Sequence, residues 1–247
     1  MSDEPLVEVT LPGSVEEVWP HLRDPELIGR WFGWDAESLA AEIDFIFVGP
    51  PAEALAEMPE GAGFEVDDEA HTLTWRYGGS DEDRFELLAD GDDQCRLRVT
   101  RTIAPESWDG VFDPLAEGWI SFVQQLRFAL EHHPGEERRT MFVSGPVTEA
   151  VDVLAVLGVD RVDGPWAGML GPDAGRSGDL WYRTERQVGV TVDQHGRALL
   201  VVATAPGGVM VTLSLYGGAA DEVADLTTRW HGWWADHVGP PSDQPVH

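Results

Sequence analysis

The chain has 247 residues, and 43% of them are hydrophobic, which is enough to fill the core of one large domain or of two smaller ones. Its formal net charge is −29, and all 16 cationic residues are arginines. Binding to nucleic acid or to an anionic membrane needs clustered cations, so the composition argues against both partners. The single cysteine, Cys95, excludes an intramolecular disulfide and a cysteine-built metal site.

The amino-terminal residues, MSDEPLVEV, have neither the basic region nor the apolar region of a signal peptide. Apolar runs fall short of the roughly 18 residues that a membrane-spanning helix needs. We therefore expect a cytoplasmic protein that does not insert in a membrane.

The chain opens with the signals of one strand and two short helices. Residues 5–11 alternate and end at a Pro-Gly turn, which predicts a strand. Ser14 stands three residues before Glu17, the spacing of a capping box, and predicts a helix start. Asp24 and Pro25 predict a second short helix, with the aspartate as N-cap and the proline in the first helical position.

Alternating segments then predict an antiparallel sheet. Residues 41–48 are interpreted as a strand with Ile43, Phe45 and Phe47 on one face, followed by a loop or irregular turn over residues 51–63. Further strands are predicted at 63–67, 71–77, 84–89 and 94–103, with Asp90 and Gly91 forming a hairpin turn. Their inward residues are Phe64, Val66, Leu73, Trp75, Tyr77, Phe85, Leu87, Cys95, Leu97, Val99, Arg101 and Ile103.

A long amphipathic helix is predicted for residues 111–130, because apolar residues recur there at helical spacing for roughly five turns. A helix of this length needs an apolar surface to lie on, and the predicted sheet supplies one. The stripe consists of Phe112, Leu115, Trp119, Phe122, Leu126 and Ala129.

Two segments carry a resemblance to a known family. VTLPGSVEEVWPHLRDPELIGRWFG near the start and EGWISFVQQLRFALE in the long helix resemble the START-like, or SRPBCC, helix-grip superfamily, in the branch related to activators of the heat-shock ATPase. The resemblance covers about residues 5–133. It implies an α+β fold, in which a curved antiparallel sheet and a long carboxy-terminal helix enclose an apolar cavity.

The second half looks like a shortened copy of the first. MFVSGPVTEAVDVL resembles the opening strand and helix, GPWAG resembles GRWFG, and Val223, Leu226, Trp230 and Trp233 repeat the helical stripe. About 24 residues are missing from the copy, so we expect a loop and one or two strands to be lost. Three alternating runs remain, at 179–192, 197–204 and 209–216. The predicted domains are 1–137, complete, and 138–240, reduced, with a disordered tail at 241–247.

A reduced sheet of this size is too small to close a cavity alone. We therefore expect the second domain to pack either on the first domain or on a second copy of the chain. The second arrangement would make a homodimer.

Several kinds of chemistry lack the residues they need. The pairs His132 with His133 and His231 with His237 do not have the spacing of helical metal ligands, so no metal site is expected. The chain has no G-x-S-x-G, no G-x-G-x-x-G after a strand and no lysine for a phosphate-binding loop. We therefore expect no cofactor, and we interpret Cys95 as a small buried hydrophobe.

The candidate binding residues are mostly aromatic. The chain has 11 tryptophans, and those at 75 and 119 can either line a cavity or fill it. Arg101 is the one cation predicted to face the core, so it needs either a protein carboxylate, with Asp44, Asp83 and Glu106 the nearest choices, or a polar group of a ligand.

By resemblance, the first domain is expected to bind a small, largely apolar or aromatic molecule, with Arg101 as the polar anchor. One alternative is a polyketide cyclase or aromatase-like enzyme, in which His71, Tyr77 or Arg101 moves a proton or polarises a carbonyl. Another is a partner-binding module like the co-chaperone relatives. The predicted ligand-binding residues are Phe45, His71, Trp75, Tyr77, Phe85, Arg101, Trp119 and Phe122.

Overall fold

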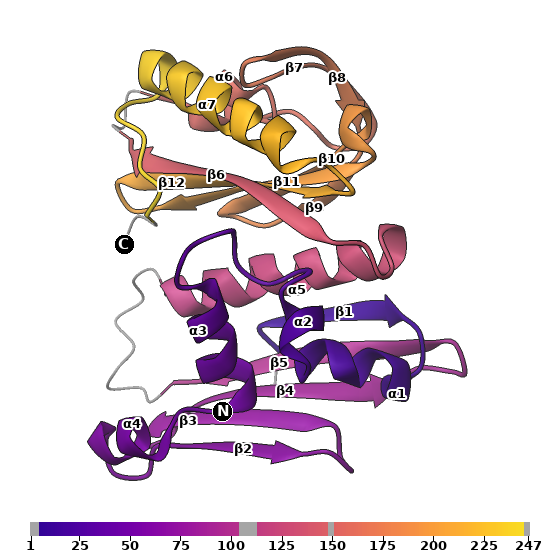
Figure 1. Cartoon of the computed structure of the whole chain (residues 1–247), viewed down its shortest axis with the longest axis vertical. Coiled ribbons are helices and arrows are strands. Elements are labelled where there is room, and N and C mark those ends of the chain that lie inside the picture. Colours follow the sequence, from indigo (N-terminus) through magenta and orange to yellow (C-terminus); the bar gives the residue numbers. More distant parts are fainter. Residues whose placement is uncertain (1–4, 104–112, 148–150, 245–247) are drawn as a thin grey trace. The chain divides into compact units, whose positions relative to one another are not determined.

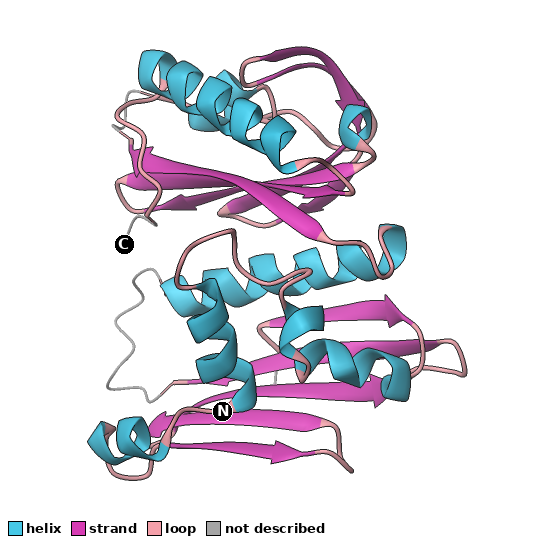
Figure 2. Ribbon diagram, viewed as in Figure 1, coloured by secondary structure: helices cyan, strands magenta, loops and turns pink. Residues whose placement is uncertain are grey.

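The computed structural model describes residues 5–103, 113–147 and 151–244. The chain divides into two compact units, Met1–Gly135 and Glu136–His247. Each unit holds a five-stranded antiparallel sheet and a long helix that follows the last strand of that sheet (Figure 1). Within each unit the helix and the sheet form separate layers (Figure 2). This is an α+β protein with the helix-grip arrangement that the sequence predicts.

The sheet of the first unit has the strand order β1-β5-β4-β3-β2, so the opening strand lies beside the last one. The predicted alternation is confirmed, because Leu97 and Val99 on β5 are fully buried while Arg98 between them is half-buried. Alternation of this kind places one face of the sheet against the core. The strands are β1 (Val7–Pro12), β2 (Gly63–Asp67), β3 (Thr72–Gly78), β4 (Asp81–Ala89) and β5 (Gln94–Thr102).

Short helical segments connect β1 to β2, and their predicted caps are present. The Glu17 N–H donates to Ser14 Oγ, and the Ser14 N–H donates back to the Glu17 carboxylate at 2.8 Å. Asp24 accepts from the Glu26 N–H at 2.9 Å. The helices are α1 (Val15–Val18), a 3-10 helix (Trp19–Leu22), α2 (Pro25–Ile28), α3 (Leu39–Ile43), a π-helix (Asp44–Val48) and α4 (Ala52–Glu57).

The predicted strand at 41–48 is wrong, because this segment is helical. Ile43 and Phe47 are four residues apart and buried, as on one face of a helix, whereas Phe45 is 39% exposed. The apolar residues at 43, 45 and 47 are compatible with a strand, and the pair four residues apart is equally compatible with a helix. Periodicity in such a short apolar run does not distinguish a helix from a strand. The good helix formers just before it, from Leu39 to Glu42, favour the helix.

The long helix of the first unit, α5, extends over Pro114–His132. Its predicted apolar stripe is confirmed from Trp119 to Ala129, and this face packs on β1 and β5. Leu115 departs from the prediction with 48% exposure. Phe112 lies outside the described residues.

The sheet of the second unit has the order β6-β12-β11-β10-β9, which again places the opening strand beside the last one. The expected loss of strands is wrong, because the run at 179–192 contains two strands and the sheet has five. GPWAG is also not helical, since Trp166 begins a strand of a separate hairpin. The strands are β6 (Arg138–Pro146), β7 (Trp166–Leu170), β8 (Asp173–Gly178), β9 (Leu180–Arg183), β10 (Gln187–Val192), β11 (Ala198–Ala205) and β12 (Gly208–Tyr216).

Two helices accompany this sheet, α6 (Val153–Leu157) and the long α7 (Ala220–His237), which packs on β6. Trp230 and Trp234 on α7 are fully buried, and Trp233 is only partly buried. Helical spacing therefore continues the stripe through Trp234, not through Trp233 as predicted. In the part of the chain that the structure describes, no helix is both long and apolar enough to cross a membrane.

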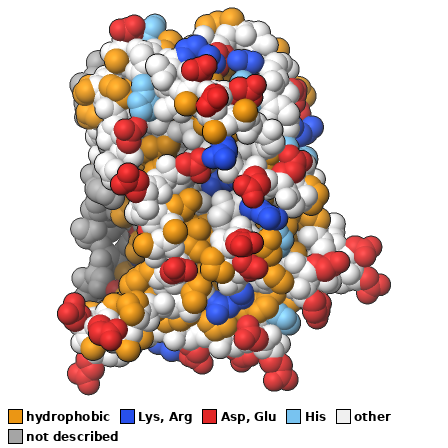
Figure 3. All heavy atoms as spheres, viewed as in Figure 1, with side chains coloured by type: hydrophobic (Ala, Val, Ile, Leu, Met, Phe, Trp, Pro, Cys, Tyr) orange, Lys and Arg blue, Asp and Glu red, His pale blue; other side chains and the backbone are white. Residues whose placement is uncertain are grey.

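The chain after α7 returns to the sheet. The Ser242 N–H donates to the Ser144 carbonyl at 2.8 Å, and the Ser144 N–H donates to the Ser242 carbonyl at 3.0 Å. Acidic side chains are spread over the face shown in Figure 3, with hydrophobic side chains between them. This distribution fits the large negative charge of the chain.

Candidate functional site

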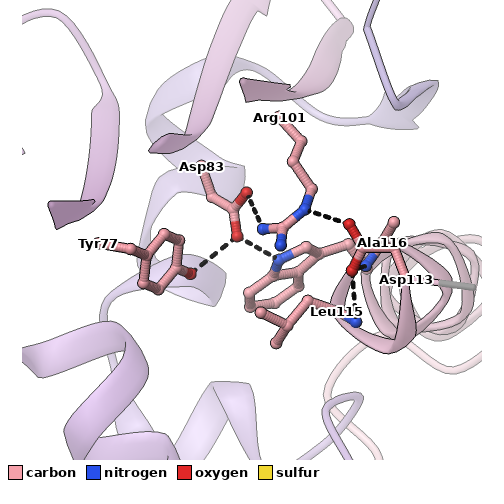
Figure 4. A network of polar contacts seen from close by, with 7 residues as sticks. Tyr77, Asp83, Arg101, Asp113, Leu115 and Ala116 are labelled. Atoms are coloured by element: carbon pink, nitrogen blue, oxygen red, sulfur yellow. Dashed lines mark hydrogen bonds and ion pairs between the residues drawn. The ribbon is translucent and has the colours of Figure 1, made fainter. Parts of the chain in front are cut away.

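A buried carboxylate, Asp83 on β4, lies at the centre of a polar network in the first unit (Figure 4). Arg101 on β5 lies directly opposite, and its Nη1 donates to Asp83 Oδ1 at 2.5 Å. Asp83 Oδ2 accepts from the Tyr77 hydroxyl at 2.8 Å and from the Trp119 indole N–H at 3.0 Å. Three strands and the long helix therefore meet at one carboxylate.

Arg101 has a second carboxylate partner in Asp113, at the start of α5. Arg101 Nε donates to Asp113 Oδ2 at 2.7 Å, while Asp113 Oδ1 accepts from the backbone N–H groups of Leu115 and Ala116. Of the partners predicted for Arg101, Asp83 is confirmed, Asp44 is replaced by Asp113, and Glu106 lies outside the described residues. Asp113 thus caps the helix and ties it to the sheet.

Asp113 is absent from the predicted site residues, although the sequence around it carries a helix-cap signal. Asp113 is followed by Pro114, the same dipeptide that marks the cap of α2 at Asp24. Aspartate before a proline at a helix start is a regular N-cap pattern.

The network combines two negative charges with one positive charge in a poorly hydrated place. Burial alone lowers the pKa of Arg101, but the attraction of Asp83 and Asp113 outweighs it and raises that pKa above the ordinary value. Burial, reinforced by the charge of Asp83, raises the pKa of Tyr77. Arg101 therefore stays charged and Tyr77 stays protonated at neutral pH. The positive end of the α5 dipole lies beside Asp113 and offsets part of the excess negative charge.

Stacked rings lead from the surface to this network, and we call Phe45, Trp75 and Tyr77 the aromatic ladder. Phe45 stacks on Trp75 with ring centroids 5.3 Å apart, and Trp75 stacks on Tyr77 at 6.1 Å. The Arg101 guanidinium carbon lies 5.8 Å from the Tyr77 ring centroid. The Trp75 indole N–H donates to the Ile46 carbonyl at 2.8 Å, which fixes the ladder to the π-helix. Phe45 is the partly exposed end of this ladder.

The wide turn of the π-helix depends on one glycine. Gly49 has φ +124, and its N–H donates to the Asp44 carbonyl at 2.9 Å. A Cβ at Gly49 would lie 2.7 Å from the ring of Phe64, so a larger residue does not fit. The side chain of Arg23 donates to the Phe47 carbonyl and satisfies another acceptor at this helix end.

A second group of rings lies under α5. Trp119 meets Phe85 edge to face at a centroid distance of 4.7 Å, and Phe122 lies 4.5 Å from Phe32. Phe32 and Phe85 are each 2% exposed. The predicted site residues Phe85, Trp119 and Phe122 therefore pack with Phe32 in one group of rings.

His71 does not join the other predicted residues. It precedes β3 at φ +52, at the opposite end of the strand from Tyr77, and its ring lies edge-on to Trp19 at 5.5 Å. The structure therefore brings seven of the eight predicted residues into one ladder, network and ring group, and leaves His71 apart.

The network combines hydrogen-bond donors with two carboxylates. The Arg101 side chain, drawn with its two carboxylate partners in Figure 4, is 14% exposed. A guanidinium in this position can bind a carbonyl or carboxylate oxygen. Cys95 is fully buried, and burial raises its pKa to about 11. The described residues hold no group of three or more His, Cys, Asp or Glu suited to a metal ion.

No protein-family model matches the sequence, and no curated protein matches it. Similar solved structures include DynU16, a putative protein of the dynemicin biosynthetic locus, at 19% identity and a TM-score of 0.31, covering 92% of this chain and 93% of that one. They also include two di-domain ARO/CYC proteins, both 11% identical. BexL, from the BE-7585A biosynthetic pathway, has a TM-score of 0.32, and the match covers 97% of this chain and 98% of the BexL chain. StfQ, from the steffimycin biosynthetic pathway, has a TM-score of 0.35, and the match covers 94% of this chain and 93% of the StfQ chain.

Proposed function

We propose that the first unit binds a small, largely apolar or aromatic molecule beside the aromatic ladder, with Arg101 as its polar anchor. The observation that carries this proposal is the position of Arg101. Its guanidinium is fixed by Asp83 and Asp113, lies over the Tyr77 ring and belongs to a side chain that is 14% exposed. A rigid cation next to stacked rings suits an aromatic molecule that carries a carbonyl group.

The test compares two ligands that differ in one carbonyl. We expect 2-acetylnaphthalene to bind the full chain more tightly than 2-ethylnaphthalene, as measured by isothermal titration calorimetry. Arg101→Leu should remove this preference, whereas Arg98→Leu, which changes a half-exposed arginine on the outer face of the same strand, should keep it. Loss of a hydrogen bond to a charged group corresponds to roughly tenfold in affinity.

A second variant covers the case in which Arg101→Leu does not fold. Phe45→Ala shortens the partly exposed end of the ladder and should weaken both ligands. The proposal is wrong if the two ligands bind equally to the unaltered chain, or if Arg101→Leu and Arg98→Leu bind alike.

The convergence of Tyr77, Asp83 and Arg101 favours one further candidate, a polyketide cyclase or aromatase-like enzyme working at the same place. In that reaction Arg101 would polarise a ketone, and Tyr77 would act as a donor rather than a base because its pKa is raised. Tyr77→Phe should then reduce the formation of cyclised product from a synthetic poly-β-ketone thioester while the unfolding midpoint changes little. An equal loss of activity and stability would rule this candidate out.

We also propose that the second unit is a shortened copy of the first, since their strand orders correspond strand by strand. Four further proposals come from the sequence. They are a relationship to activators of the heat-shock ATPase, a partner-binding role, a homodimer and a cytoplasmic location. Sedimentation of the purified chain tests the dimer, and cell fractionation tests the location.

A further inference from the structure

Two features that ordinarily attract an anion meet at the site of the first unit. One is the guanidinium of Arg101, and the other is the start of α5, a helix of 19 residues. The backbone N–H groups at a helix start carry a partial positive charge and form a common site for anions. An aromatic carboxylate would therefore suit this place, if the protein did not supply negative charge of its own.

The protein supplies that negative charge with two carboxylates. Asp113 Oδ2 accepts from Arg101 Nε at 2.7 Å, and Asp83 Oδ1 accepts from Arg101 Nη1 at 2.5 Å. Asp113 Oδ1 accepts from the N–H of Leu115 at 3.1 Å and from the N–H of Ala116 at 3.2 Å. The guanidinium and the helix start are thus both already matched with a carboxylate.

The charges of this network do not balance, because two carboxylates meet one guanidinium. The α5 dipole offsets roughly half a charge of the excess, and the site stays negative. Asp83 is fully buried, and the side chains of Arg101 and Asp113 are each 14% exposed, so water screens these charges weakly. Glu82, the neighbour of Asp83 on β4, is paired with Arg76 at 3.2 Å. A ligand that brought a further negative charge would be repelled.

We propose that the site of the first unit selects uncharged carbonyl compounds over carboxylates, and that Asp113 sets this selectivity. A ketone oxygen accepts a hydrogen bond from Arg101 without adding charge. A carboxylate would compete with Asp113 for the same guanidinium. This inference rests on the function proposed above, and it narrows the ligands of that site to neutral ones.

The test compares 2-acetylnaphthalene with 2-naphthoate, in which a charged oxygen takes the place of the methyl group. The unaltered full chain should bind 2-naphthoate more weakly by roughly tenfold or more, as measured by isothermal titration calorimetry. Removing a carboxylate from water also weakens its binding to any apolar site. The decisive measurement is therefore the change that a variant causes.

Asp113→Asn removes the charge and keeps an oxygen for the N–H groups at the start of α5. We expect it to raise the affinity for 2-naphthoate by about tenfold and to change the affinity for 2-acetylnaphthalene by less than about threefold. Asp24→Asn is the matched control, because Asp24 is the exposed N-cap of α2 and accepts from the Glu26 N–H at 2.9 Å. It should leave both affinities unchanged. Asp113→Ser also keeps a good N-cap residue without charge, and it covers the case in which Asp113→Asn does not fold.

Two results would overturn this inference and leave the proposed function standing. The unaltered chain could bind 2-naphthoate as tightly as 2-acetylnaphthalene, or the Asp113 variants could change the affinity for 2-naphthoate no more than Asp24→Asn does. A third result would remove both. If the unaltered chain binds 2-acetylnaphthalene no more tightly than 2-ethylnaphthalene, the proposed function and this inference are wrong together.

Discussion

Asp83 and Arg101 occupy directly opposed positions on β4 and β5, and Arg101 Nη1 lies 2.5 Å from Asp83 Oδ1. Asp83 is fully buried, and all three of its donors come from other elements of the first unit. The strand register thus creates an ion pair that also positions Tyr77 and Trp119. The candidate site and the stability of the first unit depend on the same contacts.

Asp83→Ala should destabilise the first unit by about 3 to 5 kcal/mol, because it leaves Arg101 short of a carboxylate and leaves the buried Trp119 and the partly buried Tyr77 without an acceptor. Urea unfolding followed by tryptophan fluorescence measures the loss. Asp92→Ala, in the exposed turn between β4 and β5, is the control and should cost less than about 0.5 kcal/mol. Equal costs for the two variants would mean that the buried pair contributes little.

Two substitutions at Asp113 separate its cap from its charge. Asp113→Asn keeps an oxygen for the N–H groups of Leu115 and Ala116 but weakens the bond to Arg101, whereas Asp113→Ala loses both. We expect the alanine variant to be less stable than the asparagine variant by about 1 kcal/mol, which is the usual contribution of an N-cap. Thermal unfolding of both variants gives the comparison. If they unfold at the same temperature, the cap does not contribute as described.

Tyr216 should make the second unit sensitive to alkaline pH. Burial raises the pKa of Tyr216 from 10 to about 12, so the folded state holds this proton more tightly than the unfolded state. The stabilisation is complete below pH 10 and is lost as the pH rises from 10 towards 12, by up to about 3 kcal/mol. Unfolding free energies across this pH range measure the effect. Tyr216→Phe should flatten the curve, whereas an unchanged slope in that variant would assign the effect to another group.

Cys95 should resist modification in the folded chain. The thiol is fully buried and its pKa is raised to about 11, so little thiolate forms at neutral pH. We expect labelling by a thiol-reactive disulfide to be slow in buffer and rapid in urea. Rapid labelling in buffer would contradict the burial of Cys95, which lies on β5 opposite Leu11 of β1.

The strands of the first unit and the helix at Trp119 were predictable from the spacing of their apolar residues. That spacing fits only a strand in the first case and only a helix in the second. The segment around Phe45 was not predictable, since its apolar residues fit both a strand and a helix, and the deciding contacts come from Trp75 and Arg23, which are distant in sequence. Trp166 shows the same limit, because a match of five letters does not distinguish a small helix from a strand.

The polar site was predictable only in part. The parity of β5 placed Arg101 inward, and its pairing with Asp83 followed from a short list of acids. The second partner, Asp113, depended on recognising a helix cap, and the separation of His71 depended on its positive φ, which residue types alone do not indicate.

Native mass spectrometry of the freshly purified chain tests most directly whether the first unit carries a small molecule beside Arg101. We predict one bound organic molecule per chain, released on denaturation, aromatic in its absorption spectrum and containing a carbonyl group. Chain prepared with Arg101→Leu should lack this molecule, while Arg98→Leu should retain it. A bare chain mass, together with no binding of 2-acetylnaphthalene, would contradict the proposed function.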